Sequence, residues 1–392
     1  MNMTPIEDDE AWAGWRAQWR LREGTIYLNH GSFGPPPEPV RAARLRWLQE
    51  MDGQPMDFFC RQLEPAWTHA GDALARFVGT GPGNLVLVEN ATYGMNILAN
   101  SLPLAAGDQV VLTDHEYGAV ARIWRRACRQ TGAEEPVIAE LPEQIESGQQ
   151  VVEAIFAPVT ERTRLIVVSH ITSPTALILP VQAICRTARE RGVAVCVDGP
   201  HAPAQLLLDI DSLGCDFYTA SCHKWLSAPF GCGFLYVAPS HQDAVRPPIL
   251  SWGRLPPEPQ RGWSDEFQWL GTRNPTSFLC IPDAIEFLAR VGEDAFRRRT
   301  HFLAQYARRK LTELTGTTPL APDSTNWYGS MVNVPLPDGD AKSLQEALWR
   351  RFRIEVPIIS WKKHRSVRVS CHLYNRRDDI DRLVTALREL LC

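Results

Sequence analysis

The chain has 392 residues, enough for one large and one small domain, and a formal net charge of −4. Hydrophobic residues make up 44% and charged residues 22%, as in an ordinary globular protein, and no basic stripe predicts a nucleic-acid partner. No apolar run approaches the roughly 20 residues of a membrane span, and ten cysteines without CxxC or metal-ligand spacing predict reduced thiols, no metal site and a cytoplasmic location.

The N-terminal segment, residues 1–29, is acidic and then amphipathic, unlike a leader peptide. From about residue 85, strand-like runs alternate with segments of helical spacing such as GAVARIWRRACRQ and VQAICRTARERG. The runs are apolar on both faces, which is typical of a buried parallel sheet and predicts an α/β fold. They are NLVLVEN (84–90), QVVLTDH (109–115), TRLIVVSH (163–170), VAVCVDGP (193–200), FYTASCH (217–223) and CGFLYVA (232–238).

Polar side chains stand at or just past the C-terminal ends of these predicted strands. In open α/β sheets, ligands bind beyond those ends, so side chains there are expected to gather around a site. A polar residue at one strand end is common and means little, but five in step favour a binding site. They are Asn90, Asp114, His170, Asp198 and His223.

The second half of the chain changes character. Residues 246–275 are rich in proline and tryptophan and predict an irregular loop, of which 247–263 is expected to shape a substrate pocket. Residues 277–314 have helical periodicity with a break at Gly292, and short strands and a last helix follow. We expect an N-terminal segment (1–29) that packs on the small domain and the active site, a large α/β domain (30–280) and a small α+β domain (281–392).

Lys224, in TASCHKWLSAP, is the only lysine before residue 310 in a chain that otherwise uses arginine. An amine can lose its proton and form a Schiff base, whereas a guanidinium stays protonated. An arginine-rich composition with one lysine left by chance explains the same fact equally well. The neighbours of Lys224 in the expected sheet therefore decide its meaning.

Those neighbours match a cofactor with an aldehyde, a phosphate and a pyridine ring. Lys224 supplies the amine, and Asp198, which ends a buried strand, supplies a carboxylate for the ring nitrogen. ENATYGMNILA offers a helix start with Thr92 for the phosphate, and Tyr117 offers a flat side chain for the ring. Each alone could be a turn residue, a cap or a core aromatic. The sequence lacks the motifs of dinucleotide binding (GxGxxG), the P-loop (GxxxxGK[ST]), the hydrolase nucleophile (GxSxG) and a zinc site (HExxH), so these rival chemistries have no support.

With these residues in place, the chain resembles the class V branch of fold-type I pyridoxal-phosphate (PLP) enzymes, and within it the isopenicillin N epimerase-like group. The resemblance spans residues 27–375 and implies a large α/β domain with a mostly parallel sheet plus a small α+β C-terminal domain. The motifs that carry it are YLNHGSFG, ENATYGMN, DHEYGAV, SHITSPTALILP, VDGPHAP, HKWLSAPFGCGFLYV, GTRNPTSFLCIPDAIEFL and RVSCHLYN.

The resemblance assigns a role to each site residue. Lys224 forms the Schiff base and later carries the α-proton, while Asp198 pairs with the ring nitrogen. Tyr117 stacks on the ring, with His115 as a neighbour only. The residues expected to hold the phosphate are Asn90, Ala91, Thr92, Ser221 and His223, and those expected to face the ring hydroxyl are Ser173 and His201.

On the substrate side, Arg368 corresponds to the family's carboxylate-binding arginine, although a strand arginine paired with a nearby acid is the alternative. Asn29 and His30 resemble a segment that lines the substrate. Thr272, in GTRNP, corresponds to a residue that reaches the partner subunit's phosphate, which implies a homodimer.

The reaction itself stays open between epimerisation at Cα of an amino acid or amino-acid conjugate and β-elimination of a sulfur group, with transamination behind. A non-catalytic protein that keeps the fold is the remaining alternative. The stretch before Arg368 has no cysteine and Cys371 is expected to be a packed thiol, so desulfuration through an enzyme persulfide is disfavoured. An epimerase needs a second acid/base opposite Lys224, and Tyr117, His30 and His201 are the candidates.

Overall fold

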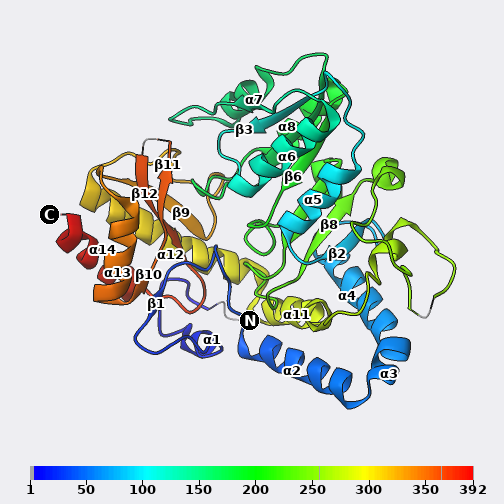
Figure 1. The fold of residues 1–392 in the computed structure, drawn as a ribbon. Coiled ribbons are helices and arrows are strands. Elements are labelled where there is room, and N and C mark those ends of the chain that lie inside the picture. Colours follow the sequence, from blue (N-terminus) through cyan, green and yellow to red (C-terminus); the bar gives the residue numbers. More distant parts are fainter. Residues whose placement is uncertain (1–3, 256, 363, 392) are drawn as a thin grey trace.

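The computed structural model describes residues 4–255, 257–362 and 364–391. Its centre is a seven-stranded sheet in the order β2-β8-β7-β6-β5-β3-β4 (Figure 1). Strand β8 runs antiparallel to β2 and β7, and the pairs among the other strands are parallel. The strands are β2 (Leu85–Val88), β3 (Gln109–Thr113), β4 (Val137–Ala139), β5 (Thr163–Ser169), β6 (Ala194–Asp198), β7 (Phe217–Ser221) and β8 (Gly233–Val237).

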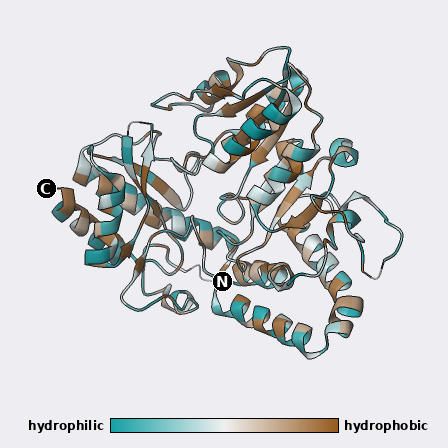
Figure 2. Cartoon of the chain, viewed as in Figure 1, coloured by the Kyte–Doolittle hydropathy of each residue, from teal (hydrophilic) through white to brown (hydrophobic). Residues whose placement is uncertain are grey.

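The two-sided apolar pattern of the strands has a direct structural cause. Successive side chains of β3 point to opposite faces, so Val110 and Leu112 pack in one core with Trp124 while Val111 packs in the other with Ile184. Helices α5 (Ala91–Ser101) and α6 (Gly118–Thr131) belong to the first core, and α4 (Leu63–Phe77) and α8 (Val181–Glu190) to the second. Figure 2 shows largely hydrophobic strands in the central sheet beside helices that carry both hydrophobic and hydrophilic residues.

The C-terminal part forms its own small sheet, with β9 (Met331–Leu336), β11 (Ile358–Trp361) and β12 (His364–Ser370) antiparallel in the order β11-β12-β9. Helix α12 packs on β9, and α13 on β11, beside α14 (Figure 1). Gly292, at φ +88°, separates two helices as the sequence predicts. The C-terminal helices are α10 (Thr276–Leu279), α11 (Ile281–Val291), α12 (Glu293–Thr315), α13 (Ala341–Phe352) and α14 (Arg377–Leu391).

The N-terminal segment contacts the C-terminal part of the chain. Strand β1 (Ile26–Tyr27) pairs in parallel with β10 (Ile354–Glu355). The fully buried Arg299 of α12 forms an ion pair with Asp9. The remaining helical elements are α1 (Ala13–Arg16), α2 (Glu38–Gly53), α3 (Pro55–Asp57), a π turn (Phe58–Gln62), α7 (Gly148–Phe156), α9 (Ile210–Leu213) and 3₁₀ turns at Pro239–Ala244 and Trp263–Phe267.

The predicted fold class is confirmed: a mostly parallel central sheet carries helices on both faces, and a small α+β unit follows. All six strand-like runs are strands, whereas the short edge strand β4 was not predicted. Helix α11 begins at the first residue of the expected small domain, but it packs on α2 and α4, which belong to the expected large domain. In the described part of the chain no helix is long and apolar enough to cross a membrane.

Candidate active site

A cavity of about 510 Å³ lies at the carboxyl ends of β6 and β7 and the start of α5. It brings together most of the residues that the sequence analysis selected. The selected residues that do not line it are Asn29, His30 and Thr272 and the strand-end residues Asp114 and His170. The selected residues that line it are Asn90, Ala91, Thr92, Tyr117, Ser173, Asp198, His201, Ser221, His223, Lys224 and Arg368.

Lys224 projects into this cavity from the loop after β7. Its carbonyl oxygen accepts a hydrogen bond from the Ser227 backbone N–H (2.9 Å) and lies 3.0 Å from His30 Nε2, which fixes the loop. The amine nitrogen lies 3.0 Å from His201 Nε2. Burial, and then the charge of Arg368, lower the pKa of Lys224 to about 7, so a large share of the amine is unprotonated at neutral pH.

Asp198 ends β6 and is buried, with 4% of its surface exposed. Burial raises the pKa of its carboxyl to about 7, and the charge of Lys224 opposes the rise. A second carboxyl, Glu116, lies near it and is held by the Ser169 hydroxyl and backbone N–H. Burial also raises the pKa of Glu116 to about 7. Asp198 therefore suits a cationic ring N–H, which would favour its ionised form.

The start of α5 forms a cradle with several donors. Asn90 caps the helix by accepting the Tyr93 backbone N–H at 2.9 Å, and the Ala91 N–H donates to Ser221 Oγ at 3.1 Å. Gly94 lets this helix approach β7, because a Cβ there would lie 2.2 Å from Thr219 Oγ1. The buried His223 Nδ1 has no hydrogen-bond partner in the structure. This orphaned polar atom beside a helix N-terminus fits a phosphate group.

Arg368 reaches the cavity from β12 of the small sheet, and 4% of its surface is exposed. Its guanidinium donates to Ser173 O (2.6 Å), Ser173 Oγ (3.2 Å) and Ser32 Oγ (2.8 Å), and its Nε has no partner. Burial lowers its pKa to about 10. No carboxylate of the described residues forms an ion pair with it, so the alternative of an arginine paired with a nearby acid does not hold. A buried cation without a counter-ion suits an anionic ligand.

Asn29, His30 and Thr272 lie elsewhere. His30 is buried behind the cavity, where Nδ1 contacts the Tyr374 hydroxyl at 2.9 Å and Nε2 contacts the Lys224 carbonyl, and burial lowers its pKa to about 3. Asn29 donates to Glu355 Oε1 at 3.3 Å. Thr272 is exposed in the loop before α10. His30 thus supports the Lys224 loop from outside the cavity, and Asn29 contacts β10 instead.

The contacts of His115, Tyr117 and Cys371 can be compared with what the sequence predicted for them. His115 packs on Trp361 and contacts Thr175, while Tyr117 lines the cavity. Cys371 is fully buried, and burial raises the pKa of its thiol. Among the described cysteines, none lines the cavity. Sequence reasoning missed Ser32 and Phe33, although both lie in the quoted YLNHGSFG motif.

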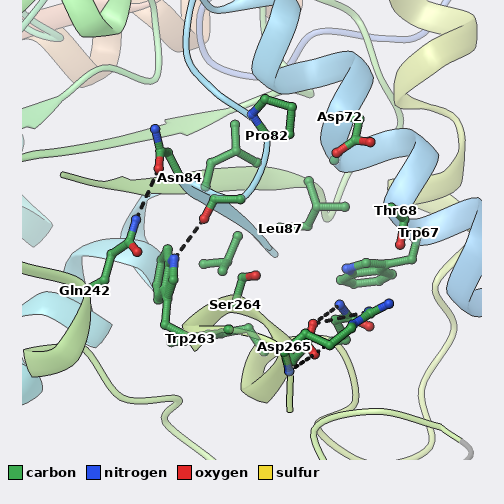
Figure 3. A pocket seen from close by; sticks show the side chains of 18 residues that line it. Trp67, Thr68, Asp72, Pro82, Asn84, Leu87, Gln242, Trp263, Ser264 and Asp265 are labelled. Atoms are coloured by element: carbon green, nitrogen blue, oxygen red, sulfur yellow. Dashed lines mark hydrogen bonds and ion pairs between the residues drawn. The ribbon is translucent and has the colours of Figure 1, made fainter. Parts of the chain in front are cut away.

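The loop expected to shape the substrate pocket lies elsewhere in this chain. The described residues of this loop supply none of the residues around Lys224. Its end, residues 261–263, borders a separate cavity of about 480 Å³ between α4 and β2 (Figure 3). There Trp263 Nε1 donates to Gly83 O at 2.8 Å, and Gln242 donates to Asn84 at 3.2 Å. That expectation was wrong for the cavity formed by this chain alone.

Comparisons with known proteins agree with this geometry. The model of the family described as "Aminotransferase class-V" matches residues 35–383. The chain belongs to the aminotransferase class-V family. It is a PLP-dependent enzyme of fold type I, and the predicted family, fold and cofactor are confirmed.

Relatives include an isopenicillin N epimerase from Amycolatopsis lactamdurans, 39% identical over 97% of this chain and 98% of that protein. One from Streptomyces clavuligerus is 37% identical over the same shares. A putative L-cysteine desulfhydrase 1 from Oryza sativa subsp. japonica is 29% identical over 96% of this chain and 85% of its own. A C-DES mutant with glycine covalently linked to PLP has the same fold, at TM-score 0.83 and 21% identity over 95% and 99% of the two chains.

Proposed function

We propose that this enzyme epimerises an amino acid or amino-acid conjugate at Cα. The observation that carries the proposal is the pairing of two groups in one cavity. The Lys224 amine can move a proton at Cα. The Arg368 guanidinium has no acidic partner among the described residues and can bind the α-carboxylate. An α-amino acid is the small molecule that needs both groups.

The cofactor would be held by side chains and backbone around the same cavity. Asp198 would face the ring nitrogen, Ser173 and His201 the ring hydroxyl, and Tyr117 the ring face. Bound PLP supplies an electron sink for the pair of electrons left when a bond at Cα breaks. The phosphate would be held by Asn90, Ala91, Thr92, Ser221 and His223.

Substrate binding and proton transfer follow from the chain's own groups. Arg368, oriented by Ser32 and Ser173, grips the α-carboxylate with two N–H donors and fixes the plane of the amino acid. Lys224 then removes the α-proton as a neutral amine, because burial lowers its pKa to about 7.

Epimerisation needs a second proton donor on the other face of Cα. His201 contacts the Lys224 amine at 3.0 Å, so a proton on His201 would arrive from the side of Lys224. His30 lies outside the cavity and is bonded to Tyr374 and to the Lys224 carbonyl. Tyr117, half exposed at the cavity, is left as the proposed second acid/base among the three candidates.

The relatives support epimerisation first and carbon–sulfur cleavage second. The two epimerases share 37–39% identity with this chain, and the rice desulfhydrase shares 29%. A C–S lyase would use Lys224 and Arg368 in the same way but would lose a β-sulfur group instead of regaining the proton. That reaction needs no cysteine in the cavity, so it is our second candidate.

We also propose a cytoplasmic homodimer in which Thr272 reaches the phosphate site of the partner subunit. Thr272 is exposed and does not line the cavity of its own chain, which leaves it free to enter another. The nine described cysteines are free thiols, which suits a reducing compartment.

Proton NMR of the PLP-loaded enzyme in D₂O with L-amino acids and cysteine conjugates tests the function. Recovered substrate that carries α-deuterium and is partly inverted, with no other product, would establish epimerisation. Pyruvate, ammonia and a thiol would establish C–S cleavage instead. Lys224→Ala is the control, and α-exchange by this variant at the parent rate would overturn the proposal.

A further inference from the structure

Lys224 is linked through His201 to Trp225, the residue that follows it in the chain. Lys224 Nζ lies 3.0 Å from His201 Nε2, and Trp225 Nε1 lies 3.3 Å from His201 Nδ1. His201 and Trp225 are each 1% exposed, so bulk water has little access to the contact between them. Both nitrogens of the imidazole are therefore engaged by protein groups.

The indole N–H fixes where the imidazole proton lies. An indole nitrogen can donate a hydrogen bond but cannot accept one. Trp225 therefore requires an unprotonated Nδ1, and a neutral His201 must carry its proton on Nε2. An imidazolium would set an N–H against the indole N–H, and burial together with the charges of Lys224 and Arg368 lowers the pKa of His201 well below its ordinary value.

The Nε2–H then points at the lysine nitrogen. An ammonium has three donors and no lone pair, so it cannot accept this hydrogen bond, whereas a neutral amine can. We propose that Trp225 is a positioning residue that sets the tautomer of His201 and thereby holds the free side chain of Lys224 as a neutral amine. The inference rests on the proposed role of Lys224, since only the neutral amine attacks an aldehyde.

The charged and titratable groups around the amine act in both directions. Arg368, from the small sheet, disfavours the ammonium, and Asp198, at the end of β6, favours it. His223, two residues after β7, has its own pKa lowered by burial and by Lys224. Without the indole N–H, His201 could move its proton to Nδ1 and accept from an ammonium at Nε2. Loss of Trp225 is therefore expected to raise the pKa of Lys224.

The amine can be titrated directly in cofactor-free protein labelled with ¹³C-lysine. The chain has five lysines, so the Lys224 signal is identified by its absence in Lys224→Ala. The parent is expected to titrate near pH 7. In Trp225→Phe the midpoint should rise by about one unit, which is a tenfold fall in the ratio of neutral amine to ammonium at a given pH.

Trp124→Phe is the matched control, because Trp124 is also fully buried and donates its indole N–H, but to Met95 Sδ in the core beside α6. It should leave the midpoint of Lys224 unchanged. An unchanged midpoint in a folded Trp225→Phe protein would overturn the inference.

A second measurement needs no change at Trp225. In ¹⁵N-histidine-labelled parent protein, His201 is identified by comparison with His201→Gln. The expected pattern is an unprotonated Nδ1 and a protonated Nε2. The opposite tautomer or an imidazolium would refute the proposed role of Trp225. These readouts use cofactor-free protein. If these measurements give the expected tautomer and midpoint but Lys224 does not bind PLP, only the proposed function is refuted.

Discussion

Replacing Arg368 with lysine keeps the positive charge and removes the planar pair of donors. Arg368 now donates to Ser173 and Ser32, which leaves a fixed guanidinium facing the cavity. Lysine is a point charge on a flexible stem and cannot grip a carboxylate with two parallel bonds. The cost should be one charge-assisted hydrogen bond, roughly 2–3 kcal/mol, or a loss of about 30- to 150-fold in kcat/KM.

The loss should appear mainly in KM, because the carboxylate is bound both before and during proton transfer. The assay is the rate of α-hydrogen exchange in D₂O as a function of substrate concentration. Arg365→Lys is the matched control: Arg365 lies on the same strand, but its guanidinium bonds the carbonyls of Pro337 and Asp338, away from the cavity. Its kinetics should match those of the parent.

A substrate analogue without the α-carboxylate completes the test. The parent should exchange the α-hydrogen of the corresponding amine far more slowly than that of the amino acid. In Arg368→Lys the ratio of the two exchange rates, amino acid over amine, should fall by roughly 30- to 150-fold, the same factor by which kcat/KM for the amino acid falls. If the variant prefers the amino acid over the amine as strongly as the parent does, Arg368 does not bind the carboxylate.

Three other predictions use different readouts. Lys224→Met should raise the Tm of cofactor-free protein at pH 6 more than at pH 11. The pKa of Lys224 is about 7 in the folded protein, below its ordinary value in the unfolded chain, so the protonated lysine destabilises the fold at pH 6. At pH 11 the amine is neutral in both the folded and the unfolded chain, so an equal gain in Tm at both pH values would contradict the lowered pKa. Tyr117→Phe should keep α-deuterium exchange with retention but lose inversion by about 10²-fold or more, measured by chiral chromatography; unchanged inversion would remove Tyr117 as second acid. Mixing inactive Lys224→Ala with Thr272→Ala should restore one working site per mixed dimer, and no gain over the separate variants contradicts a shared site.

The strand-end pattern predicted part of the cavity lining, because the sheet is mostly parallel and the strand ends meet at one edge. Asn90, Asp198 and His223 reach the cavity as expected. Asp114 and His170 do not, since Asp114 turns to Lys362 and the Leu141 backbone N–H, and His170 turns to the Tyr218 hydroxyl. Position at a strand end is set by the backbone, but the direction of a side chain depends on partners far away in sequence.

Other features left no local signal. The reversed direction of β8 cannot be read from an apolar run, because a buried strand looks the same in either direction. Trp225 looks like any core tryptophan, and only the folded structure places its N–H on His201. The missing counter-ion of Arg368 is likewise a property of three dimensions. The sequence could suggest a carboxylate clamp but could not exclude a nearby acid.

The cavity draws its two decisive groups from different sheets, which explains the contacts behind it. Lys224 follows β7 of the large sheet, and Arg368 belongs to β12 of the small one. The distance between amine and guanidinium therefore depends on how the two sheets dock. His30 spans that junction, because it contacts the Lys224 carbonyl on one side and the Tyr374 hydroxyl, just past β12, on the other. His30, which does not line the cavity, can thus hold the proposed proton-transferring group, Lys224, in register with the proposed carboxylate-binding group, Arg368.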